Sequence, residues 1–243
     1  MEYVEIIDSD SDEITQFHNL VLVEAFPDYN EREDISILRS NIKEGSWVNG
    51  NEICKYHLII ARDNTDIVGG ASFYFFSFGD YAIGMGSYLA VKKEFRRKGV
   101  GVRLMGARDR ILSRDSQRFC SYIRGLVVQV NDPSLMSMDD IKRDPMDPWV
   151  REMFWKRRGY RKIAFNFIQP SIRLNDSPVE YLSLHIFSYS PEWDNMDQLS
   201  SDELHDIIYC FVRCTGTVGP MESDPSYLRM ESELASQNYF TII

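Results

Sequence analysis

Residues 89–104, with the sequence LAVKKEFRRKGVGVRL, constrain the fold of this 243-residue chain more than any other stretch. An apolar, strand-like run ends at Val91, a basic turn with Gly99 and Gly101 follows, and an amphipathic helix is expected from about Val100. The first amides of a helix have no intrahelical acceptor, and glycines let a ligand approach the backbone. This order therefore predicts an anion site for a phosphorylated cofactor.

Positive charge is concentrated in the same region. The chain has a net charge of -10, yet residues 92–118 carry ten basic and three acidic residues, which is +7 there and -17 elsewhere. A local cationic region in an acidic chain suits a polyanionic ligand and argues against non-specific nucleic-acid binding. We interpret Arg108, Arg110, Arg114 and Arg118 as the solvated face of the helix.

Composition also bounds where the chain is expected to work. No apolar run of about 18 residues predicts a membrane span, so no membrane partner is expected. The acidic N-terminus lacks the basic and then apolar order of a secretory signal. The four cysteines are scattered except for Cys210 and Cys214, which indicates a reducing, cytoplasmic location. Without a second pair of ligands, we interpret these two as buried helix residues and expect no metal site.

Periodicity and turn residues predict an ordered series of elements. We expect strands at residues 3–7, 55–62, 67–78, 81–91 and 125–130, and a closing strand pair at 163–172 and 180–189. Helices are expected at 11–25 with Ser11 as its cap, at 31–43, from about 100, at 149–158 and at 201–214. Residues 131–148 read as irregular, either a lid or recognition loop or a disordered insertion.

Three familiar phosphate-binding motifs do not fit this chain. A dinucleotide-binding fingerprint needs a third glycine where Leu104 stands. A P-loop needs a lysine where Asn51 stands, and no kinase-type catalytic loop follows the glycines. These classes of nucleotide-binding protein are therefore excluded.

The motif Arg96-x-x-Gly99-x-Gly101 resembles the pyrophosphate loop of the GNAT superfamily of N-acetyltransferases, Arg/Gln-x-x-Gly-x-Gly/Ala. Downstream, FWKRRGY at residues 154–160 is similar to the helix signature of that family. The resemblance spans residues 3–189 or so. It implies an α/β (α+β) fold with a mixed, mostly antiparallel central sheet flanked by helices. It also implies a GNAT-like domain at 1–189, with a C-terminal helical extension at 190–243 packed on the same domain.

The resemblance implies acetyl-CoA as co-substrate and direct transfer of its acyl group to an amine of a small molecule or a protein. Backbone groups of Leu89 and Val91 would pair with the pantetheine arm, and Asn131 would lie near the thioester. The remaining expected cofactor-binding residues form the loop itself: Arg96, Arg97, Lys98, Gly99, Val100, Gly101 and Val102. Helix-start amides and charge-assisted bonds would hold the diphosphate there.

The catalytic positions depart from the family. Met85 stands where a glutamate base is frequent, and Trp155 stands where a tyrosine acid is frequent. Glu24 or Asp28 could act as the base through water, although the pattern favours an exposed solubilising carboxylate at each position. An inactive acyl-CoA-binding sensor or interaction domain is therefore the alternative function. The tail from residue 190 could also form a homodimer or bind a partner.

Overall fold

The computed structural model describes residues 1–49, 52–174 and 176–243, so Asn51 lies outside the described residues. The chain divides into two compact units, Met1–Ile123 and Arg124–Ile243. None of the described helices is both long enough and apolar enough to cross a membrane.

The first unit contains an antiparallel sheet. Its strands lie in the order β1 (Glu2–Glu5), β3 (Glu52–Asp63), β4 (Asp66–Ser77) and β5 (Tyr81–Val91), and β2 (Ser46–Asn49) also pairs with β3. The strands predicted at 55–62, 67–78 and 81–91 are confirmed, with β3 starting three residues earlier. Both faces of β4 are buried, as expected from its phenylalanines, because helices cover the sheet on both sides.

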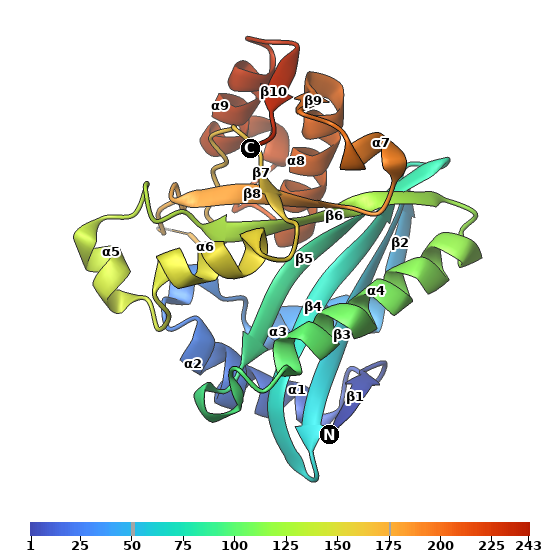
Figure 1. Ribbon diagram of the computed structural model, residues 1–243, viewed down its shortest axis with the longest axis vertical. Helices are drawn as coiled ribbons and strands as arrows, with labels where there is room; N and C mark the ends of the chain where they lie inside the picture. Colours follow the sequence, from blue (N-terminus) through green and yellow to red (C-terminus); the bar gives the residue numbers. More distant parts are fainter. Residues whose placement is uncertain (50–51, 175) are drawn as a thin grey trace. The chain divides into compact units, whose positions relative to one another are not determined.

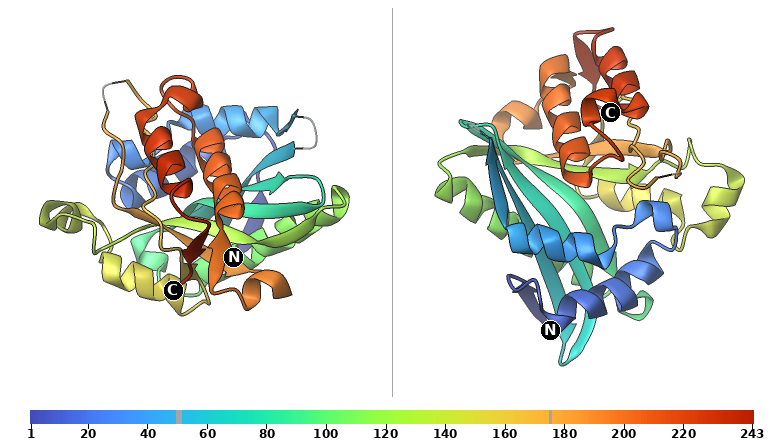
Figure 2. Two further views of the ribbon diagram at one scale, coloured as in Figure 1. Left: turned by 90° about the horizontal axis from the view of Figure 1, so that it is seen from above. Right: turned by 180° about the vertical axis from the view of Figure 1, so that it is seen from behind.

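Helix α4 (Val100–Arg118) crosses one face of β3, β4 and β5, and the N-terminal helices cover the other (Figures 1 and 2). Those helices are α1 (Asp12–Phe17), the π-helical turn η1 (His18–Leu22), α2 (Val23–Ala25), the 3-10 turn η2 (Tyr29–Glu31) and α3 (Ile35–Glu44). Ser11 accepts the Glu13 amide, as a helix cap should. The helix predicted from residue 31 begins only at Ile35, because Asp34 has extended backbone geometry.

The second unit pairs β6 (Tyr122–Asn131) with β8 (Leu182–Ser188), and β8 with β7 (Arg161–Lys162), all antiparallel. A small sheet joins β9 (Gln198–Ser200) to β10 (Tyr239–Thr241). The other elements are α5 (Met138–Arg143), α6 (Pro148–Lys156), α7 (Pro191–Asp194), α8 (Ser201–Thr215), η4 (Met221–Ser223) and α9 (Pro225–Leu234). Antiparallel strands flanked by helices confirm the expected fold class.

Two sequence predictions in this unit are wrong. The strand expected at 163–172 reduces to β7 and to isolated bridges from Ile163 to Ile242 and from Gln169 to Val179. Its apolar residues instead pack against the C-terminal part of the unit, where Phe165 and Phe240 meet edge to face. The segment expected to be irregular, 131–148, contains α5, which begins with a complete capping box between Ser137 and Asp140.

Candidate functional site

The loop between β5 and α4 has the geometry of a helix-start anion site. After a 3-10 turn, η3 (Lys93–Phe95), the backbone enters the left-handed region at Arg97 (φ 61°) and again at Gly99 (φ 80°). Glycine adopts this conformation without a steric penalty, which explains its place as the N-cap of α4. The second reversal turns the chain directly into the first turn of the helix.

The amides at the start of α4 are available to a ligand. Among the described residues, no backbone carbonyl or capping side chain accepts a hydrogen bond from the amides of residues 98–102. A Cβ placed on Gly99 would meet nothing within 4 Å, and one placed on Gly101 would meet only Val91 Cγ2 at 3.9 Å. The backbone is therefore open to an incoming group, and its amides together with the helix dipole favour an anion.

Basic side chains that form no ion pair among the described residues surround this helix start. The Arg96 Nε donates to the Val91 carbonyl at 3.0 Å, which ties the loop to its strand. The Lys98 ammonium lies 4.9 Å from the ring centroid of Phe95, and Arg97 is exposed. No carboxylate in the described part of the chain pairs with Arg96, Arg97 or Lys98. The positive charge at the loop thus remains available for a diphosphate.

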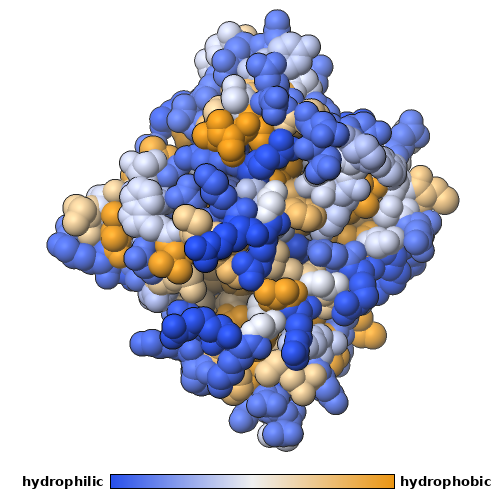
Figure 3. All heavy atoms as spheres, in the orientation of Figure 1, coloured by the Kyte–Doolittle hydropathy of each residue, from blue (hydrophilic) through white to orange (hydrophobic). Residues whose placement is uncertain are grey.

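The arginine-rich face of α4 is only partly solvated. Arg110 and Arg118 are exposed as expected, and hydrophilic side chains dominate the region of α4 in Figure 3. Arg108 is buried instead and bonds to Asp109, which corrects the sequence interpretation. Its stem lies on the sheet side of the helix, where a long side chain packs along apolar surface.

The other expected cofactor contacts lie on two strands. Leu89 and Val91 are half-buried on β5, opposite Ala71 and Gly69 of β4. Asn131 ends β6 in the second unit, and its amide donates to Asp144 at 3.3 Å. Their roles toward the pantetheine arm and the thioester stay predictions.

The expected catalytic positions contain no clear acid–base pair. Glu24 is exposed on the single turn of α2, and Asp28 is half-buried between α2 and η2. Met85 is buried opposite Tyr74, and Trp155 is buried with its ring centroid 4.8 Å from that of Tyr160. Neither Met85 nor Trp155 offers a transferable proton, so the structure leaves both sequence candidates for the base as proposals.

Sequence reasoning missed a buried carboxylate, Glu33, in the segment between η2 and α3. It is 5% exposed, and its backbone amide donates to the Tyr88 hydroxyl at 2.9 Å. Tyr88 is also buried, so it belongs to the core as expected, but its hydroxyl has a polar role. Nothing in the acidic stretch around residue 33 distinguishes this glutamate from its solvated neighbours.

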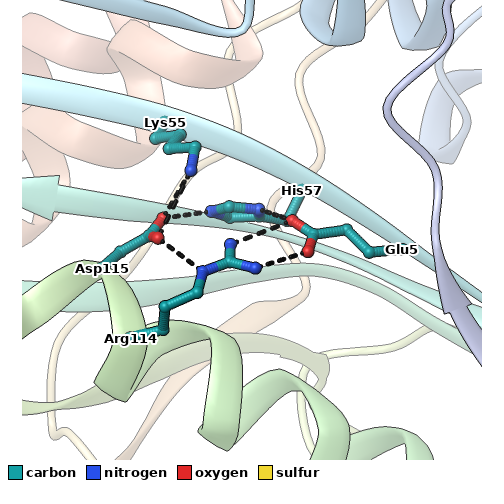
Figure 4. A network of polar contacts seen from close by, with 5 residues as sticks. All are labelled: Glu5, Lys55, His57, Arg114 and Asp115. Atoms are coloured by element: carbon teal, nitrogen blue, oxygen red, sulfur yellow. Dashed lines mark hydrogen bonds and ion pairs between the residues drawn. The ribbon is translucent and has the colours of Figure 1, made fainter. Parts of the chain in front are cut away.

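Sequence reasoning also missed a charged network between β1, β3 and α4 (Figure 4). His57 lies between two carboxylates, with Nδ1 2.7 Å from Glu5 and Nε2 2.8 Å from Asp115. Arg114 bonds to both carboxylates and Lys55 to Asp115 alone. The two ring nitrogens of His57 thus bridge the two carboxylates. All five residues have partners within the network, which makes it structural.

Comparison with known proteins agrees with this loop geometry. Residues 54–162 match the family model described as an acetyltransferase (GNAT) domain, which includes β5, the glycine loop and α4. Over these residues, the chain resembles a GNAT acetyltransferase domain. The resemblance seen in the loop motif is thereby confirmed. A comparison with curated proteins found no match.

Solved structures that resemble this chain do so at low sequence identity. An acetyltransferase named as a GNAT-family member from Bacteroides thetaiotaomicron has 18% identity and a TM-score of 0.54, covering 88% of this chain and 96% of its own. An aminoglycoside 6'-N-acetyltransferase complexed with coenzyme A has 16% identity and a TM-score of 0.47, covering 79% and 98%. At such identities, the first of these likenesses shows the fold alone.

Proposed function

We propose that this protein is an N-acyltransferase that moves an acyl group, acetyl in the first instance, from a coenzyme A thioester directly to an amine of a small molecule or a protein. The observation that carries the proposal is the open start of α4, where the amides of residues 98–102 lack acceptors among the described residues. A diphosphate supplies the anionic acceptors that these amides need. The GNAT domain over residues 54–162 supports the same donor.

The residues expected to hold the donor divide by the groups they offer. Backbone amides of Lys98 to Val102 would bind the diphosphate, and Arg97 and Lys98 would add charge-assisted bonds. Arg96 would act indirectly, because its guanidinium already ties the loop to the Val91 carbonyl. Backbone groups of Leu89 would align the pantetheine arm beside β5.

The transfer needs no nucleophile from the protein. A free alkyl ammonium has a pKa of about 10, so the acceptor must first lose a proton to a base or to water. The nitrogen lone pair then attacks the thioester carbon, the C–S bond breaks, and the sulfur leaves as a thiolate. The nitrogen loses its second proton as the amide forms, and the thiolate takes up a proton. Glu24 and Asp28 remain the sequence candidates for a base that acts through water.

The donor site is tested by calorimetric titration of coenzyme A into Gly101→Glu. Its side chain would occupy the open space above the helix start and repel the diphosphate, so binding should be lost. Gly99→Glu should lose binding too. Gly106→Glu is the matched control, because it places the same charge in the same helix at a glycine whose Cβ would meet only Arg110 Nη1, at 3.8 Å. Unchanged affinity in both loop variants would refute the site.

The second candidate function is that of an acyl-CoA-binding sensor without catalytic activity. Met85 and Trp155 both lack the proton chemistry frequent at their positions, which favours an acyl-CoA sensor. A thiol-release assay with an amine panel separates the two candidates. A sensor binds acetyl-CoA but releases coenzyme A no faster than buffer does.

We also propose a cytoplasmic location and a possible homodimer. All four cysteines are free, which suits a reducing compartment. Sizing of the full chain by light scattering tests the dimer, and localisation of a tagged full-length chain tests the compartment.

A further inference from the structure

A buried polar cluster lies on the face of β3, β4 and β5 that α3 covers. Its members are Glu33, Tyr56 of β3, Ser72 of β4 and Tyr88 of β5, with exposures of 5, 7, 1 and 9%. Helix α3 reaches the same face, since the Asn41 amide donates to the Tyr74 hydroxyl at 3.0 Å. The cluster belongs wholly to the first unit, like the glycine loop.

A β-bulge brings the end of β5 into this cluster. Ser72 pairs with Tyr88, but the next residue of β4, Phe73, pairs with Gly86, so Ser87 has no opposite residue. Because Ser72 and Tyr74 lie on one side of β4, their partners Tyr88 and Met85 also share that side. The side chain of Tyr88, three residues before the loop starts, is thereby directed at Glu33 rather than away from it.

Some hydroxyl groups of the cluster make no hydrogen bond within it. The hydroxyls of Tyr56 and Ser72 lie near each other but not in the geometry of a hydrogen bond. Neither hydroxyl has another partner among the residues described. Burial and then the charge of Glu33 raise the pKa of Tyr56 and Tyr88, so both remain protonated donors at neutral pH. Buried polar groups in proteins normally find partners, so such a pair beside a carboxylate indicates a polar ligand.

We propose that Glu33, with the ring and hydroxyl of Tyr56, binds the ammonium group of a cationic acceptor amine. A carboxylate beside a tyrosine is chemistry that recognises an organic cation, by charge and by cation–π attraction. Tyr88 is a positioning residue, because its hydroxyl accepts the Glu33 amide and donates to the Glu31 carbonyl at 3.4 Å. The proposal rests on the proposed acyl transfer and names its acceptor class.

The position of the cluster suits this role. Tyr88 lies three residues before Val91, about 10 Å along the strand that leads into the glycine loop. The acceptor amine and the coenzyme A thioester would therefore both bind next to β5. Glu33 would also supply a carboxylate on the side of the sheet where Met85 offers none.

The test is a calorimetric titration of tyramine, of spermidine and of tyrosol, the uncharged alcohol analogue of tyramine. Each is titrated into the full chain alone and in the presence of saturating coenzyme A. Wild type is expected to bind at least one amine about tenfold or more tightly than tyrosol, and Glu33→Gln should lose about tenfold or more of that affinity. Glu33→Asp keeps the charge and should retain most of it.

Glu44→Gln is the matched control, because it removes one exposed carboxylate from the end of α3. It should leave amine binding unchanged, and every variant should keep the wild-type affinity for coenzyme A. If Glu33→Gln does not fold, Tyr88→Phe is used instead and should raise the KM for the amine more than it lowers kcat.

Each outcome decides the proposal. Equal amine affinity in wild type and Glu33→Gln, or tyrosol binding as tight as amine binding in wild type, overturns the ammonium site. An equal loss of amine and coenzyme A affinity in Glu33→Gln is a folding effect, and Tyr88→Phe then decides: an unchanged KM for the amine overturns the site. Failure of wild type to bind acetyl-CoA overturns the proposed function instead, and the titration of the free protein still decides the role of Glu33.

Discussion

Gly99 and Gly101 stand two residues apart but are required for different reasons. Gly99 has a φ of 80°, which places it in the left-handed region that other residues adopt only at a cost. Gly101 lies inside α4 with ordinary helical geometry and open space around its Cβ position. The first glycine therefore serves the backbone turn, whereas the second keeps the approach to the amides free.

This difference predicts opposite effects of alanine on stability. Gly101→Ala should stabilise the protein by about 0.5–1 kcal/mol, because alanine is the better helix former. Gly99→Ala should destabilise it by about 1 kcal/mol through the strained φ. Urea unfolding of both variants measures the free energies. A stabilised Gly99→Ala would show that the left-handed turn is not kept in solution.

At the scale of elements, the charged network in Figure 4 joins β1, β3 and α4. Asp115 has no exposed side-chain surface and receives hydrogen bonds from His57, Lys55 and Arg114. Burial alone would raise its pKa, but these cations lower it below the usual aspartate range. Burial would also raise the pKa of Glu5, but its bonds to His57 and Arg114 lower this pKa to about 2.

The network predicts a loss of stability in acid. Both carboxylates have folded pKa values below their unfolded ones, so their contribution is complete above about pH 4.5 and is lost as pH falls toward 2. Asp115→Asn should cost roughly 3–5 kcal/mol at pH 7, because it removes the carboxylate that the buried His57 ring and two basic side chains share. It should also flatten the acid dependence.

Guanidinium unfolding at pH 7, 5 and 3 measures this effect. Asp139→Asn is the control, because the Asp139 side chain is 84% exposed. Parallel stability curves for wild type and Asp115→Asn between pH 5 and 3 would contradict the assignment.

A second element-scale contact joins α1 to the sheet at Gly70 of β4. A Cβ there would lie 2.5 Å from Phe17 Cε2 and 2.8 Å from the Ile59 carbonyl oxygen. Gly70→Ala should therefore destabilise the protein by about 1–3 kcal/mol through overpacking. Gly219→Ala, with nothing within 4 Å of its Cβ, should stay within about 0.5 kcal/mol of wild type by thermal melting. Equal melting temperatures would mean that the helix moves aside freely.

At the scale of the whole molecule, the C-terminal residues are part of the second unit. The Lys162 amide donates to the Ile243 carbonyl at 2.8 Å, and the indole of Trp193 packs where Gly125 leaves room for it. Leu204, Ile208 and Phe211 of α8 and Met230 and Leu234 of α9 are buried as well. The division into residues 1–189 and 190–243 stays a prediction, and these contacts show what a cut at that point would remove.

Deletion of residues 190–243 should therefore unfold the second unit rather than release a stable domain. The truncated chain is expected to lose its cooperative thermal transition, to bind a hydrophobic dye and to elute as aggregates on a sizing column. A monodisperse truncated chain that melts cooperatively would show that the extension is an independent partner-binding module.

Local signals in the sequence were sufficient for most elements and for the loop. Alternating apolar residues identified β3, β4 and β5, and the glycines with their basic neighbours identified the start of α4. Such signals arise from contacts between near neighbours in the chain, so sequence spacing reveals them. The strand expected at 163–172 failed because a partner was distant, since Ile163 bridges to Ile242, whereas α5 was missed although its capping box is a local signal.

The sequence by itself therefore determined the glycine loop before α4 and the family that the loop resembles. Only the tertiary structure decided that Glu33 meets Tyr88, 55 residues away, and that His57 meets Asp115, 58 residues away. Each of these polar residues is ordinary in its local sequence. Each residue became part of a buried polar cluster because it packs beside a particular partner. Such burial depends on how distant segments of the chain pack together rather than on their composition.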